Sequence, residues 1–177
     1  MSNEFINHLN IFGAKVEKAM PRINSGGCAV FATLVAERLR KHFDTRIRTA
    51  GYVWDNARKG VDEARAIIKR NSLTEWQGAG ISFGHVIVEF DCDGDTFHYD
   101  TTGVIPAAPR TKAFDFEVFD GHFSVEEMRV LALDSGGRGW NNEFDHRSLT
   151  PTLKFMVKQF FMHEDFAFKV KEHVTAQ

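Results

Sequence analysis

The sequence has few cysteines, few prolines and no long hydrophobic run, and each shortage excludes a class of protein. Two cysteines among 177 residues are too few for a disulfide scaffold, so we expect both thiols to be reduced. Four prolines and 14 glycines, beside 12% aromatic residues, exclude a disordered chain. A transmembrane helix needs about 18 consecutive apolar residues, and the sequence contains no such stretch.

Neither sign of charge dominates the chain. The 22 basic and 24 acidic residues give a net charge of −2, which argues against a nucleic-acid-binding protein that depends on positive charge. Residues 1–4 lack the basic and apolar regions of a secretory signal. We therefore expect a cytoplasmic protein with neither nucleic-acid nor membrane partners.

The length suits a single domain, residues 1–177, whose core needs no metal or disulfide. Apolar periodicity and helix-boundary residues predict helices, and alternating patterns predict strands. The helices are expected at 2–20, 28–43, 57–71, 124–133 and from Thr150-Pro151 onward, and the strands at 46–54, 85–92, 95–100 and 113–119. This order predicts the α+β class, with helices packed on a central antiparallel sheet.

The segment 85–100 shows the clearest hairpin pattern. Asp93-Gly94 separates two β-rich runs, which predicts a two-residue type I′ turn. With this turn, one face of the hairpin is apolar, and the other carries most of the polar residues. Asp100 then becomes a diagonal neighbour of His85 on the polar face, with Cα atoms about 7–8 Å apart. We expect the imidazole and the carboxylate to form a hydrogen bond.

The two cysteines have opposite surroundings. Cys28 follows Ser25-Gly26-Gly27 and opens a predicted helix, where free N–H groups and the helix dipole stabilise a thiolate. Cys92 lies between two aspartates on what we expect to be an exposed turn, and negative neighbours disfavour a thiolate. Cys28 is therefore the candidate nucleophile, with His85 as its base and Asp100 as the group that orients the base.

Four short motifs occur in order within residues 24–104: S-G-G-C-A-V-F-A, A-G-Y, G-H-V-I-V-E-F and Y-D-T-T-G. Together they resemble the transglutaminase-like branch of the papain-like cysteine enzymes, and they are similar to arylamine N-acetyltransferases. The resemblance implies a papain-like fold and a triad of Cys28, His85 and Asp100. It also implies attack on an amide bond of a protein or peptide-like substrate, without metal or cofactor. Hydrolysis, as in a peptidase or amidase, and acyl transfer to an amine, as in a transglutaminase, both remain open.

The motifs depart from the papain pattern at two positions. Ala29 follows the nucleophile where papain-type enzymes have an aromatic residue, and Arg22 stands where papain-like proteases have their oxyanion glutamine. A side-chain donor from Asn24 or Trp54 is the candidate to assist the N–H of Cys28 in binding an oxyanion.

Two other classes of function are alternatives to the thiol enzyme. His85, His98 and Asp100 share the polar face and form a possible set of two histidines and one carboxylate for a metal ion. A non-catalytic binding module would keep the same fold and use Phe155 and Phe166 as a partner patch. We expect the rest of the domain to cover these two rings.

Overall fold

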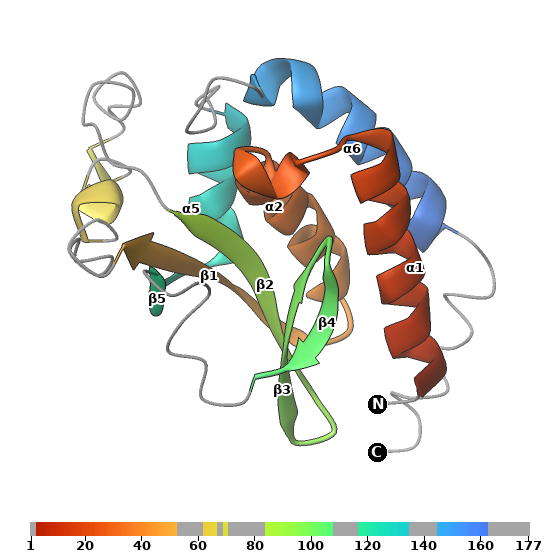
Figure 1. The fold of residues 1–177 in the computed structure, drawn as a ribbon. Helices are drawn as coiled ribbons and strands as arrows, with labels where there is room; N and C mark the ends of the chain where they lie inside the picture. The colour runs from red at the N-terminus through yellow and green to blue at the C-terminus, as the bar shows by residue number, and fades with distance from the viewer. Residues whose placement is uncertain are drawn as a thin grey trace.

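The computed structural model describes residues 3–52, 62–66, 69–70, 84–107, 117–134 and 145–162. Within these residues, helices pack on an antiparallel sheet (Figure 1). The elements are α1 (Asn3–Ala19), η1 (Ile23–Ser25), α2 (Cys28–Leu39), β1 (Asp44–Tyr52), β2 (His85–Cys92), β3 (Asp95–Asp100), β4 (Gly103–Pro106), β5 (Glu117–Phe123), α5 (Val125–Arg129), the π-helix η2 (Val130–Asp134) and α6 (His146–Phe161). This arrangement confirms the predicted α+β class.

Among the described residues, the sheet has five strands in the order β4-β3-β2-β1-β5, and all neighbouring pairs are antiparallel. The β2–β3 hairpin has the predicted turn, because Asp93 (φ 54°) and Gly94 (φ 83°) both have the positive φ that a type I′ turn requires. Its register pairs Phe90 with Phe97, as predicted. Strand β5 occupies 117–123, later than the predicted 113–119, of which residues 113–116 lie outside the described residues.

Helix α2 is the centre of the packing (Figure 1). It contacts β1, β2 and β3 of the sheet, and also α5 and α6. Its Phe31 is 1% exposed and lies against Phe12 of α1 and Tyr99 of β3. Burial of one such ring contributes about 1.5–3 kcal/mol. Since Cys28 is the first residue of α2, this packing also places the candidate nucleophile.

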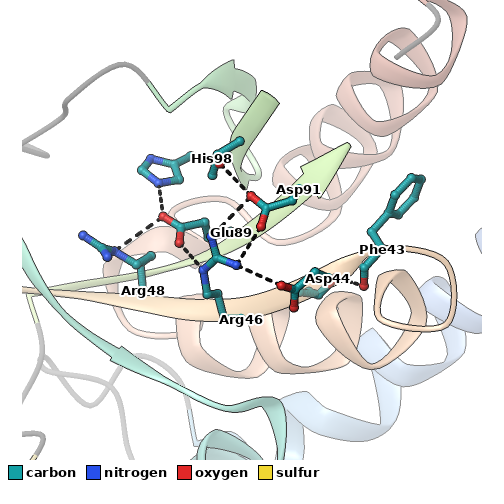
Figure 2. Close-up of polar contacts among 9 residues, drawn as sticks. Phe43, Asp44, Arg46, Arg48, Glu89, Asp91 and His98 are labelled. Carbon is teal, nitrogen blue, oxygen red and sulfur yellow. Dashed lines mark hydrogen bonds and ion pairs between the residues drawn. The ribbon is translucent and has the colours of Figure 1, made fainter. Parts of the chain in front are cut away.

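The polar face of the hairpin is buried as well, which the alternating pattern does not predict. Glu89 is 6% exposed and His98 is 4% exposed. Figure 2 shows the reason: Glu89 accepts hydrogen bonds from His98 Nε2 (2.7 Å) and Arg46 Nε (2.5 Å), and Arg48 Nε lies 3.6 Å away. Burial alone would raise the pKa of Glu89, but these donors and their charges outweigh it and lower the pKa to about 2. The buried carboxylate is thus stabilised by its cationic neighbours.

Helix α6 begins at His146, not at Thr150 as predicted. The Asp145 side chain accepts a hydrogen bond from the N–H of Arg147 at 3.0 Å and so caps the helix before the proline is reached. Pro151 consequently lies inside the helix, where it removes one main-chain hydrogen bond. The prediction placed the start of this helix at the proline, whereas the Asp145 cap places it at His146.

Two other boundaries are settled by local contacts. Helix α2 ends at Leu39, before the predicted Phe43, because the chain leaves the helix through turns that return to the Leu39 carbonyl. Ser124 and Glu127 form the predicted capping box at the start of α5.

Of the proposed partner patch, Phe155 is 63% exposed, so the described residues do not cover it as expected. Phe166 lies outside the described residues.

Residues 62–66 of the predicted helix 57–71 are helical. None of the helices that the structure describes has the length and apolar character to cross a membrane.

Candidate active site

Cys28 lies at the uncapped start of α2. The N-cap residue is Gly27, which offers no side-chain hydrogen bond to the first turn, so the N–H groups there are available to a negative group beside the thiol. A Cβ on Gly27 would lie 2.8 Å from both Ile23 Cγ1 and Leu149 Cδ2. The glycine before the nucleophile is therefore required by the close approach of η1 and α6.

We expect Gly27→Ala to destabilise the fold by about 1–3 kcal/mol, as overpacking does, and to slow alkylation of Cys28 by displacing the first turn of α2. Urea unfolding and the rate of Cys28 alkylation measure the two effects. Gly94→Ala is the matched control, because a Cβ at Gly94 meets nothing within 4 Å but still has a positive φ of +83°. That variant should lose stability and keep the reactivity of Cys28, and equal reactivity in both variants would contradict the prediction.

The structure brings Cys28, His85 and Asp100 together. His85 Nε2 donates a hydrogen bond to Asp100 Oδ2 at 2.8 Å, and the His85 ring also forms a hydrogen bond with the Cys28 side chain. Because Nε2 is occupied by the carboxylate, Nδ1 is the nitrogen left for the sulfur. Cys28 and His85 are 6% and 5% exposed, so this chain of contacts is almost entirely removed from water.

His85 and Asp100 shift each other's pKa toward the charged form. Burial alone would lower the pKa of His85, but the hydrogen bonds to Asp100 and Cys28 and the negative charges of both groups raise it to about 10. Burial would likewise raise the pKa of Asp100, yet hydrogen bonds from His85 and Thr102 lower it. At neutral pH the Asp100 carboxylate and the His85 imidazolium are therefore a charged pair, and the Cys28 side chain lies beside the ring.

The Asp100 carboxylate is fixed from its other side by the turn that follows β3. Its Oδ1 accepts hydrogen bonds from the N–H of Thr102 (2.7 Å) and from the Thr102 hydroxyl (2.5 Å). Capping of this turn was the alternative role for Asp100, and the structure shows that one oxygen performs it while the other binds His85.

A side chain of α1 joins this turn, through hydrogen bonds, to the chain that precedes Cys28. One oxygen of Glu17 accepts from the Thr101 hydroxyl at 3.1 Å, and the other accepts from the N–H of Arg22 at 2.9 Å. Asn10 Oδ1 accepts from the N–H of Val104 at 2.7 Å. The sequence offers no signal for these links, because they join residues far apart in the chain.

Asn24 lies in η1, and its Oδ1 is buried without a hydrogen-bond partner among the described residues. Trp54 lies outside the described residues.

Cys92 is not on an exposed turn, contrary to expectation. It is 5% exposed, because it is the last residue of β2 and points into the core. Burial and the charges of Asp93 and Asp95 raise its pKa to about 11. Cys92 therefore resists ionisation, as expected, and burial is the larger cause of its raised pKa.

The metal alternative is not supported by the geometry. His85 binds Asp100 while His98 binds Glu89, so the two imidazoles are directed at different carboxylates. No group of three or more His, Cys, Asp or Glu side chains in the part of the chain that the structure describes is arranged to hold a metal ion.

Comparison of the chain with models of protein families, with curated proteins and with solved structures finds no match. The function must therefore be argued from the site itself.

Proposed function

We propose that the protein is a thiol-dependent enzyme that cleaves or transfers an acyl group at an amide bond of a protein or peptide-like substrate. The observation that carries the proposal is the buried chain of contacts from Asp100 through His85 to Cys28 at the start of α2. A nucleophile, a base in contact with it and a group that orients the base are the parts that such a reaction needs.

In the first half of the reaction, the Cys28 thiolate attacks the substrate carbonyl carbon, and a C–S bond forms. The imidazolium of His85 gives its Nδ1 proton to the departing amine as the C–N bond breaks, which leaves a thioester on Cys28. In the second half, neutral His85 takes a proton from water or from an acceptor amine that attacks the thioester. The C–S bond breaks, the thiolate returns, and His85 is again an imidazolium. Asp100 stabilises that charge in both halves.

The oxyanion that forms during each attack needs donors close to the nucleophile. The proposal assigns this role to the N–H of Cys28, which the uncapped N-terminus of α2 leaves available, with help from the side chain of Asn24 or Trp54. The proposal also includes the papain-like or transglutaminase-like fold and a reducing compartment such as the cytoplasm. Cys28 and Cys92 are not joined by a disulfide, which is consistent with that compartment.

An activated ester tests the proposal without knowledge of the natural substrate. We expect p-nitrophenyl acetate to acetylate Cys28, with a burst of p-nitrophenol equal to the protein concentration, followed by slower release of the acetyl group. Intact-mass and peptide mass spectrometry identify the acetylated residue. Cys28→Ala should abolish the burst, and Cys92→Ala, which removes the other buried thiol, should retain it. A burst that survives in Cys28→Ala, or none in the wild type, would overturn the proposed function.

The second half of the reaction is read from the same experiment. If added glycinamide shortens the lifetime of the acetyl-enzyme and becomes acetylated, the enzyme is an acyltransferase. If only water releases the acetyl group, it is a hydrolase.

A further inference from the structure

Another buried histidine, His146, lies next to the loop that precedes Cys28 and takes no part in the proposed triad. It is the first residue of α6 and is 6% exposed. Its Nε2 is 2.9 Å from the carbonyl oxygen of Gly26, two residues before Cys28. Its Nδ1 is 3.2 Å from the carbonyl oxygen of Ala132, in η2. The ring therefore bridges the chain that leads to Cys28 and a helix from the C-terminal half of the protein.

Both partners of the ring are main-chain carbonyl oxygens. A carbonyl oxygen has no proton to give, so the ring is the donor in its hydrogen bonds to them. We propose that His146 is a positioning residue whose ring joins the Gly26 carbonyl to η2 and so fixes the turn that presents Cys28. This inference rests on the proposed function only for the role of Cys28.

The contact with Ala132 lies at the end of a helical segment. Ala132 belongs to the last turn of the continuous helical segment formed by α5 and η2, where carbonyl groups lack helical partners and the dipole has its negative end. Among the described residues, both polar contacts of the ring are with main-chain carbonyls.

Three described titratable groups of the elements around the ring have partners of their own. Asp134 of η2 lies 3.9 Å from Arg129, and Asp145 accepts from the N–H of Arg147 and the hydroxyl of Ser148. On α2, Cys28 contacts His85.

Helix α1 meets α6 through apolar rings, where Phe12 stacks on Phe160 and lies edge-on to Phe161.

The wild-type protein provides the first test, which needs no activity. Nuclear magnetic resonance of protein labelled with ¹⁵N-histidine, with His146 assigned by its loss in His146→Gln, should show a His146 ring N–H that exchanges slowly with water, because a buried hydrogen bond to a main-chain carbonyl protects it. A His146 ring N–H that exchanges as fast as that of an exposed histidine would overturn the inference.

The second test measures the consequence for Cys28. In His146→Gln the amide offers its NH₂ to one carbonyl only, and we expect alkylation of Cys28 by iodoacetamide to slow by about tenfold, equivalent to about 1.4 kcal/mol. The matched control is Leu153→Ala, which removes a fully buried side chain farther along α6 without touching either carbonyl. It should stay within about twofold of the wild-type rate. Equal slowing in both variants, or no slowing in His146→Gln, contradicts the positioning role. Failure of the proposed function would instead show as an unreactive Cys28 in the wild type, with the His146 spectrum unchanged.

Discussion

Iodoacetamide at about pH 6 should label Cys28 at least a hundredfold faster than Cys92, an expectation that follows from the thiolate being the reactive species. The pKa of Cys92 is raised to about 11, so only about one in 10⁵ of its thiols is ionised at that pH. Cys28 instead contacts an imidazolium whose pKa of about 10 keeps it charged throughout the neutral range. The cation beside Cys28 and the very small thiolate fraction of Cys92 both favour labelling of Cys28.

Access to the reagent does not explain such a difference. Cys28 and Cys92 are 6% and 5% exposed, so the reagent must penetrate the folded protein to a similar extent at both. Cys92 is therefore an internal control for Cys28 in the same molecule. Mass spectrometry of the labelled peptides over time gives both rates.

His85→Ala should remove most of the advantage of Cys28, because it deletes the cation that stabilises the thiolate. His98→Ala is the matched control: it removes another buried histidine from the same hairpin, one that binds Glu89 instead. That variant should leave the labelling ratio nearly unchanged. Equal labelling of the two cysteines in the wild type would leave Cys28 as a packing residue and remove the main support for an enzyme.

Glu89→Gln should destabilise the fold by about 3 kcal/mol, in the range measured when one partner of a buried ion pair is removed. The carboxylate receives hydrogen bonds from His98 and Arg46 and lies close to Arg48 (Figure 2). A neutral amide of the same shape cannot balance the charges of the two arginines. Urea unfolding monitored by circular dichroism measures the loss.

The pH dependence of this effect has a definite sign. The pKa of Glu89 is lowered from 4.5 to about 2 on folding, so its stabilisation is complete above pH 4.5 and is lost as the pH falls toward 2. The wild type should therefore lose more stability than Glu89→Gln across this interval.

The control for Glu89 is Asp44→Asn, which alters another carboxylate near Arg46. Asp44 Oδ2 is 3.5 Å from Arg46 Nη1, and its side chain is 79% exposed, so we expect a change within about 0.5 kcal/mol. A loss below about 1 kcal/mol in Glu89→Gln would show that the cluster tolerates the unpaired cations, contrary to the expected penalty for buried charge.

Local patterns were sufficient to predict the hairpin and the relation between two of the three site residues. A turn with positive φ at Asp93 and Gly94 sets the register, and the two-residue period of a strand then places His85 and Asp100 on one face. The start of α2 at Cys28 was predicted in the same way, from the glycines that precede it. These features depend on neighbours in sequence or across one turn.

The tertiary structure decided which residues support the site. Glu17 joins Arg22 to Thr101, and His146 joins Gly26 to Ala132, through contacts that no local period encodes. Burial of the polar hairpin face also depended on β1, whose arginines pair with Glu89. The physical reason is the same in each case. Periodicity determines which way a side chain points along its own element, but the partner that it meets depends on how separate elements pack.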